Sequence, residues 1–207
     1  MKYIAILALT LSSSFSANAA LLDVGNGIEI SVINGEKVKD ANSYELIKGQ
    51  NQLAIQFSGS LNKSGKRAHF STVPYLVVVD VKENDLSVEL VSKKYNVIDK
   101  KVSSAQPVFQ FITDNEPLNS KQVILPPADS FLPYGNIHEL VTTYNNERGL
   151  VFDSGKIREL KKELASVTEN TKLENRESEN ALQLKLWYSR ANEEERKAFQ
   201  KWIIDHN

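Results

Sequence analysis

Apolar and polar residues alternate along most of the chain before residue 135, which is the pattern of strands that bury only one face. Ile28, Ile30 and Val32 alternate with polar residues and are expected to face the same way. Residues 75–81 are apolar on both faces, which predicts a central strand. The strands predicted in this way span residues 28–32, 53–57, 75–81, 86–90, 108–113 and 122–125.

Turn-forming residues separate these strands. Asn34 and Gly35 follow the first strand directly, and both tolerate the positive φ that a type I′ hairpin turn requires. They predict a hairpin with a short return strand at 36–39. The polar stretch 59–66 is expected to be a loop. Pro74 is expected to split the next segment into two strands or to form a bulged edge, because proline cannot donate to a sheet ladder.

After residue 135 the spacing of apolar residues changes to the period of an amphipathic helix. Asn136 can cap the first of these helices, and Gly149 lies just beyond its end. A second helix is predicted to begin with Asp153 or Ser154 as its cap. The apolar stripes of these two helices are Ile137, Leu140, Val141 and Tyr144 in the first, and Ile157, Leu160, Leu164 and Val167 in the second.

Two more helices are predicted near the C-terminus. One spans about residues 178–190, and the next begins at Asn192, with Glu195 at the position that completes a capping box. Strands are thus segregated from helices, which argues against a wound sheet and predicts an α+β fold. The predicted organisation is a signal peptide at 1–19, a mainly antiparallel β-rich domain at 20–135, and a helical C-terminal region at 136–207 packed on it.

The N-terminus has the three parts of a secretory signal. Lys2 supplies the positive charge, and residues 3–11 form a short apolar run. Ala17 and Ala19 then give the small-x-small pattern that signal peptidase recognises, with cleavage between Ala19 and Ala20. The apolar run is much shorter than the roughly 20 residues that span a bilayer. The sequence therefore predicts export to the bacterial periplasm through a cleavable signal peptide.

The exported form is expected to begin at Ala20. Intact mass and N-terminal sequencing of the protein released from the periplasm would measure this directly. Retention of residues 1–19 in the released protein would contradict the prediction.

The amino-acid composition excludes several classes of binding partner and several kinds of active-site chemistry. The chain has no cysteine, which excludes a lipid anchor on a cysteine at the cleavage site, a thiol nucleophile and a thiolate metal site. Lys and Arg number 25 against 26 Asp and Glu, whereas a nucleic-acid-binding surface usually brings a basic excess. No later apolar segment is long enough to span a membrane. We therefore expect no nucleic-acid partner, no membrane anchor and no cofactor.

Catalytic signatures are also missing. The three histidines, His69, His138 and His206, are dispersed and form no His-x-x-x-His pair, so no metal site is assigned. No Gly-x-Ser-x-Gly elbow and no glycine-rich phosphate loop is present. A catalytic pair of carboxylates is neither assigned nor excluded, because chance pairs are common among 26 acidic residues. No catalytic residue is assigned from the sequence.

The aromatic residues near the C-terminus have two interpretations, an exposed platform that binds a ligand or a buried core. Trp187, Tyr188, Phe199 and Trp202 lie at helical spacing on the last two predicted helices. This spacing favours a core where those helices meet over an exposed platform. The same interpretation is made for three phenylalanines elsewhere in the chain, namely Phe109, Phe111 and Phe131.

The last two predicted helices carry a family resemblance. The run 184–188, followed by Ala191, Phe199 and Trp202, resembles the closing signature of a family of uncharacterised bacterial periplasmic proteins. Residues 32–35 and 49–55 near the N-terminus resemble the same family. The family is similar to the curli synthesis inhibitor, and this similarity implies a protein that restrains assembly of secreted amyloid subunits. No catalytic residues are defined for the family.

Two function hypotheses remain. The first is a non-enzymatic periplasmic binding or inhibitory protein whose partner is an extended or unfolded secreted polypeptide. The hairpin at 34–35 and the strand beside Pro74 are its candidate sheet edges, and the sequence does not choose between them. The alternative is a periplasmic hydrolase of unknown substrate, with a site built from scattered acidic residues and histidine. A deep cleft in which His138, Asp or Glu side chains converge favours the hydrolase, and a shallow groove beside an unpaired strand favours the binder.

Overall fold

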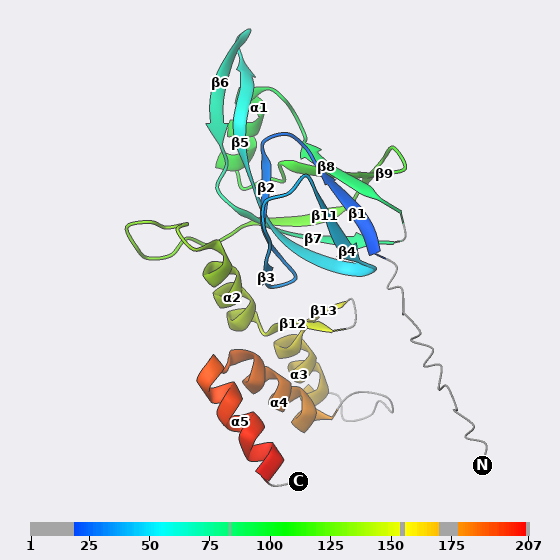
Figure 1. Ribbon diagram of the computed structural model, residues 1–207, viewed down its shortest axis with the longest axis vertical. Helices are drawn as coiled ribbons and strands as arrows, with labels where there is room; N and C mark the ends of the chain where they lie inside the picture. Colours follow the sequence, from blue (N-terminus) through cyan, green and yellow to red (C-terminus); the bar gives the residue numbers. More distant parts are fainter. Residues whose placement is uncertain (1–18, 83, 154–155, 170–177, 206–207) are drawn as a thin grey trace, which may run out of the picture.

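The computed structural model describes residues 19–82, 84–153, 156–169 and 178–205, and its strand-rich half precedes its helical half (Figure 1). The predicted signal peptide lies outside the described residues except for Ala19, which begins the first strand. The fold is mixed α and β, strands predominate, and most helices lie toward the C-terminus. This agrees with the predicted α+β class.

Two sheets make up the strand-rich half. The first sheet has the order β10-β9-β8-β1-β4, and the second has the order β11-β7-β5-β2-β3, with β6 paired to the far half of β5. All neighbours within the two sheets pair antiparallel except β1 and β8, which pair parallel. The strands are β1 (Ala19–Val24), β2 (Ile28–Ile33), β3 (Glu36–Lys37), β4 (Ser43–Ile47), β5 (Gly49–Lys63), β6 (Lys66–Ser71), β7 (Tyr75–Val81), β8 (Leu86–Leu90), β9 (Phe109–Thr113), β10 (Glu116–Leu118) and β11 (Ser120–Ile124).

The two sheets share one hydrophobic core. Leu22 and Phe111 enter it from the first sheet, and Leu53 and Val77 from the second, all fully buried. The predicted central position of residues 75–81 is confirmed, because β7 pairs with β5 on one side and β11 on the other. Burial raises the pKa of the Tyr75 hydroxyl, which donates a hydrogen bond to the Gln106 carbonyl at 3.2 Å.

A β-bulge in β2 changes which face its residues occupy. The pairing of β2 with β5 shifts between Ile30 and Val32, so Ile30 lies in the core between the sheets. Val32 lies on the opposite face, where it packs in a second cluster under a helix. The prediction that the two residues face the same way is therefore wrong, because one extra residue in a strand reverses the alternation beyond it.

The predicted loop at 59–66 is wrong. β5 continues to Lys63 and β6 starts at Lys66, so only Ser64 and Gly65 form the turn, both with positive φ. This hairpin projects beyond the two-sheet core (Figure 1). Because most of its side chains are exposed on both faces, its sequence lacks the alternation that marked the other strands.

A short helix, α1 (Tyr95–Ser103), interrupts the strands and was not predicted. It buries Ile98 in the core between the sheets, with Tyr95 and Val102 partly buried beside it. These three residues have the i, i+3 and i+7 spacing of a helix face. The sequence therefore contains the helical pattern of α1, but this pattern is one short apolar stripe within a region of predicted strands.

Helix α2 (Ile137–Arg148) joins the strand-rich half to the rest of the chain. The predicted cap is confirmed, since the Asn136 side chain accepts a hydrogen bond from the Glu139 backbone N–H at 3.3 Å. Gly149 ends the helix with a φ of 62°, a left-handed conformation that favours glycine. Val141 is fully buried against Val32 and its neighbours on the outer face of the second sheet.

The chain beyond α2 forms a hairpin and three helices. The hairpin pairs β12 (Leu150–Asp153) with β13 (Lys156–Glu159), and it is followed by α3 (Leu160–Glu169), α4 (Glu179–Arg190) and α5 (Glu193–Asp205). The helix predicted to start at Asp153 therefore starts at Leu160 instead, and the other predicted cap, Ser154, lies outside the described residues. Leu160, Leu182 and Leu186 form a third core between α3 and α4. No described helix has both the length and the apolar character needed to cross a membrane.

Candidate functional site

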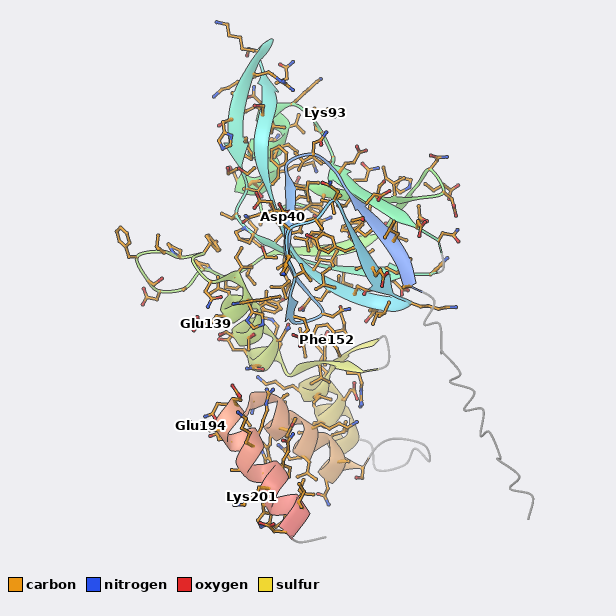
Figure 2. The ribbon with its side chains drawn as sticks, viewed as in Figure 1. Asp40, Lys93, Glu139, Phe152, Glu194 and Lys201 are labelled. Carbon is orange, nitrogen blue, oxygen red and sulfur yellow. The ribbon has the colours of Figure 1, made fainter. Side chains whose placement is uncertain are left out.

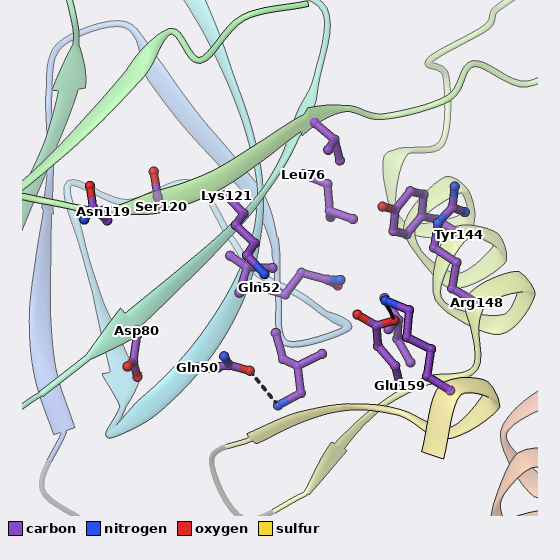
Figure 3. A pocket seen from close by; sticks show the side chains of 15 residues that line it. Gln50, Gln52, Leu76, Asp80, Asn119, Ser120, Lys121, Tyr144, Arg148 and Glu159 are labelled. Atoms are coloured by element: carbon purple, nitrogen blue, oxygen red, sulfur yellow. Dashed lines mark hydrogen bonds and ion pairs between the residues drawn. The ribbon is translucent and has the colours of Figure 1, made fainter. Parts of the chain in front are cut away.

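A groove of about 700 Å³ lies over the outer face of the second sheet (Figure 3). Its floor comes from β5, β7 and β11, and its far wall comes from α2 and the β12–β13 hairpin. The residues that matter most to its chemistry are Gln50, Gln52, Val78, Lys121, Val123 and Ile157. The groove thus joins segments that are more than a hundred residues apart in the chain.

Most polar groups on the α2 side of the groove contact one another. The Arg148 guanidinium lies over the Tyr144 ring, 3.7 Å from its centre. Lys162 forms an ion pair with Glu159. The Gln50 side-chain oxygen accepts a hydrogen bond from the Ile157 backbone N–H at 3.3 Å, which ties β13 to β5 (Figure 3). These contacts hold the wall in place. The floor adds amides, apolar side chains and two exposed charged residues, Asp80 and Lys121.

A buried amide pair fixes α2 against the sheet at the end of this groove. Gln52 is 1% exposed and Asn145 is 6% exposed. Gln52 Nε2 donates to Asn145 Oδ1 at 2.8 Å, and Asn145 Nδ2 donates back to Gln52 Oε1 at 2.9 Å. Two complementary hydrogen bonds make the position of α2 specific, because a shift of either partner would leave a buried amide unsatisfied.

One edge of the groove is formed by β11, the edge strand of the second sheet. Lys121 and Val123 are exposed on this strand and line the groove. The Gln122 side chain turns the other way and accepts hydrogen bonds from the Val108 and Phe109 backbone N–H groups, both at 3.1 Å. The groove therefore lies beside an edge strand. Sequence reasoning did not single out this strand as an edge.

The two sheet edges predicted from the sequence have different outcomes. The strand β3 is an edge strand, but it has only two residues, and the adjacent Gly35 carbonyl receives a contact from His138 Nε2 at 3.1 Å. The second edge, beside Pro74, is wrong for β7, because β7 has a neighbour on each side. The strand before Pro74, β6, does lie at an edge, since β5 is its one described neighbour. The Pro74 carbonyl itself accepts the Leu125 backbone N–H at 2.9 Å.

The histidines do not line the groove. His69 lies on the projecting hairpin, with Nε2 3.2 Å from the Ser71 hydroxyl, and His206 lies outside the described residues. His138 lies in a separate, more open depression of about 500 Å³ together with Glu29 and Asp40. Its Nε2 donates to the Gly35 carbonyl, which gives the ring a structural role. Within the described ranges, no group of three His, Cys, Asp or Glu side chains is placed to hold a metal ion.

Helices α4 and α5 carry an exposed aromatic surface, which we define as Leu184, Trp187, Tyr188, Phe199, Trp202 and Ile203. Figure 2 shows these two helices with their side chains, beside the labelled Glu194 and Lys201 of α5. Trp187 is 60% exposed and Trp202 is 54% exposed. The prediction that these aromatic residues form a core is therefore wrong. They lie on the stripe expected for a core, but no described part of the chain buries the stripe.

The aromatic surface is ordered by contacts between its two helices. Phe199 and Trp202 stack with ring centres 6.0 Å apart, and Tyr188 lies 6.4 Å from Phe199. The Gln200 amide donates to the Tyr188 hydroxyl at 2.8 Å. At the start of α5 the predicted capping box is confirmed, because Asn192 and Glu195 exchange side-chain to backbone hydrogen bonds at 2.8 and 2.9 Å.

The three phenylalanines expected in the core divide into two groups. Phe109 and Phe111 are buried between the sheets, which confirms the prediction for both. Phe131 is 97% exposed, so the prediction for it is wrong. It lies in the proline-rich connection between β11 and α2, and this segment belongs to no helix or strand that would turn the ring inward.

Known bacterial proteins resemble this chain over most of its length. A UPF0319 protein of Vibrio vulnificus strain YJ016 is 27% identical over 206 residues, which cover 93% of both chains. A UPF0319 protein of Vibrio parahaemolyticus serotype O3:K6 is 24% identical over 184 residues, which cover 88% of this chain and 84% of the relative. No solved structure matches the chain. Residues 22–202 match the family described as an uncharacterized protein conserved in bacteria (DUF2057), and the chain therefore belongs to that family.

Proposed function

We propose that this protein is a non-enzymatic binding protein of the bacterial periplasm, which holds an extended polypeptide in the groove over the second sheet. The partner proposed is a secreted subunit of the amyloid, curli type, whose assembly the protein restrains. The single observation that carries the proposal is an open groove of about 700 Å³ beside the edge strand β11, whose floor and walls combine amides, apolar side chains and charged side chains but no described histidine.

The chemistry of the groove suits an extended chain. Such a chain presents a backbone donor and acceptor at every residue and needs polar partners at regular intervals. Asn119, Ser120 and Gln50 supply such partners on the open side of the groove. Val78 and Val123 also line the groove and offer apolar contacts for the side chains of the ligand.

Two further observations support this proposal. The pattern at residues 1–19 directs the chain to the periplasm, where secreted subunits pass in an unfolded state. The class of subunit is proposed from the expected similarity of this family to the curli synthesis inhibitor. The alternative is a periplasmic hydrolase, and its acid and histidine groups would be Glu29, Asp40 and His138 in the open depression.

Blocking the groove is expected to weaken binding of the polypeptide. Val123 is 42% exposed on β11, so Val123→Arg places a long cation in the groove without disturbing the core. The wild-type protein beginning at Ala20 is expected to lengthen the lag time of fibril formation by a curli-type subunit at equal ratio. V123R is expected to weaken this effect about tenfold, which corresponds to about 1.4 kcal/mol of binding energy.

The matched control is Val97→Arg, because Val97 is 38% exposed on α1 and does not line the groove. V97R is expected to inhibit fibril formation as the wild-type protein does. If the wild-type protein changes neither lag time nor fibril yield, and light scattering detects no complex, the proposal fails for this partner. Cleavage of the subunit, seen by mass spectrometry, would support the hydrolase instead.

A further inference from the structure

The hairpin of β5 and β6 carries a concentration of positive charge at its tip. The sequence has no Asp or Glu between Glu45 and Asp80, so the whole hairpin lacks an acidic residue. Three exposed cations, Lys63, Lys66 and Arg67, lie next to its turn. Lys and Arg number 25 in the chain and are matched by 26 Asp and Glu, so the excess of positive charge is local to this hairpin.

A second segment adds two more cations beside the hairpin. The Asn62 backbone N–H donates to the Lys93 carbonyl at 2.9 Å, and Asn62 pairs with Lys94 in a parallel bridge. Both lysines are exposed, and Figure 2 labels Lys93 next to the hairpin. The Phe70 and Tyr95 rings meet edge to face with centres 4.9 Å apart, which packs the hairpin against α1. We define the basic tip as these five cations, Lys63, Lys66, Arg67, Lys93 and Lys94.

The charges of the basic tip are not balanced within the described chain. None of its five side chains forms an ion pair with a described residue. Lys63 lies directly opposite Lys66 across the hairpin, and like charges in this position destabilise a pair of strands. The Lys63 ammonium lies 4.2 Å from the centre of the Tyr95 ring, a contact that holds the cation without neutralising it. The basic tip is therefore suited to a partner that supplies negative charge.

The shape and composition of the basic tip favour a lipid bilayer over a protein or a nucleic acid. The hairpin projects beyond the two-sheet core, so its tip can meet a flat surface without interference from that core (Figure 1). Four of the five cations are lysines, whereas protein–protein interfaces are depleted in lysine and enriched in arginine and aromatic residues. Nucleic-acid-binding domains usually carry a basic excess over the whole domain, but this chain has a formal net charge of -1.

We propose that the basic tip docks this protein on a lipid bilayer that carries anionic phosphate headgroups. Each Lys or Arg near such a surface raises the affinity about fivefold, and salt weakens the attraction. Helices α4 and α5 lie at the opposite end of the molecule, and α2 and the β12–β13 hairpin lie between them and the basic tip (Figure 1). A bilayer at the tip therefore leaves the groove open. The docking does not depend on what the groove binds.

Binding to lipid vesicles tests the proposal. The protein beginning at Ala20 is mixed with vesicles of phosphatidylcholine that contain roughly 30% phosphatidylglycerol, and flotation measures the bound fraction. We expect binding at about 50 mM salt, loss of binding at about 500 mM salt, and no binding to vesicles of phosphatidylcholine alone. Replacing Lys66, Lys93 and Lys94 together by glutamine is expected to lower the affinity for the anionic vesicles about 100-fold. All three side chains are exposed, so this triple variant is expected to keep the wild-type circular dichroism spectrum.

The matched control replaces three exposed lysines elsewhere, Lys37, Lys39 and Lys201, by glutamine. It changes the net charge by the same amount and is expected to bind anionic vesicles within about threefold of the wild-type affinity. Equal binding of the wild-type protein to both kinds of vesicle, or binding to neither, would overturn the proposal.

Two other results would also overturn the proposal. One is a basic-tip variant that binds anionic vesicles as well as the control variant does. The other is a wild-type protein that binds a short DNA duplex or polyglutamate but no vesicle, because the basic tip would then serve a different polyanion. The fibril assay with V123R contains no lipid, so it tests the proposed function separately.

Discussion

Replacing Phe111 by alanine is expected to lower the free energy of unfolding by about 3–5 kcal/mol, the usual cost of removing a large aromatic side chain from a core. Phe111 is fully buried on β9, between β8 and β10, in the core that the two sheets share. Its removal leaves a cavity that the surrounding strands can fill only in part. Urea unfolding followed by far-ultraviolet circular dichroism would measure the loss.

Trp202→Ala is the control for this prediction, because it also removes a large aromatic side chain. Trp202 is 54% exposed, so its truncation is expected to cost no more than about 1 kcal/mol. Equal losses for the two variants would contradict the placement of Trp202 on the surface.

Local signals in the sequence predicted local structure well. The Asn34-Gly35 turn has positive φ at both residues, as a type I′ hairpin requires. Asn136 caps α2 and Gly149 ends it. The capping box of Asn192 and Glu195 starts α5. In each case the residues that form the interaction are close in the chain, so their spacing alone identifies the structure.

Features that depend on distant segments could not be predicted in this way. The bulge in β2 arises from its pairing with β5, and the alternation in the sequence continues through it. The segment 157–164 has helical spacing, yet its first residues form β13 because β12 is available to pair with them. The aromatic stripe of α5 has the spacing of a core, and its exposure depends on whether another layer packs over it.

The groove is the clearest case of a site that the sequence could not reveal. Its lining comes from β5, β7, β11, α2 and the β12–β13 hairpin, and no two of these segments share a recognisable motif. Gln52 lies on the face of β5 opposite to Leu53 and Ile55. That face is nevertheless buried, because α2 returns to cover it from a point 93 residues further along the chain.

The buried amide pair of Gln52 and Asn145 leads to the second large prediction. Gln52→Leu leaves the Asn145 amide buried without its partner, and Asn145→Leu does the same to Gln52. Each single variant is expected to lose about 1–3 kcal/mol of unfolding free energy, the cost of an unsatisfied buried polar group. The double variant Q52L/N145L removes both amides at once, and it is expected to lose clearly less than the sum of the two single variants.

Gln56→Leu is the control for this double-mutant cycle, because it makes the same substitution on the same strand. The Gln56 amide donates to Glu29 at 2.8 Å in an exposed position, so its loss is expected to change the unfolding free energy by less than about 0.5 kcal/mol. Denaturant unfolding of all four variants would give the coupling energy. If the losses at Gln52 and Asn145 simply add, the two amides do not depend on each other. In that case α2 would be held on the sheet by the apolar contacts around Val141 alone.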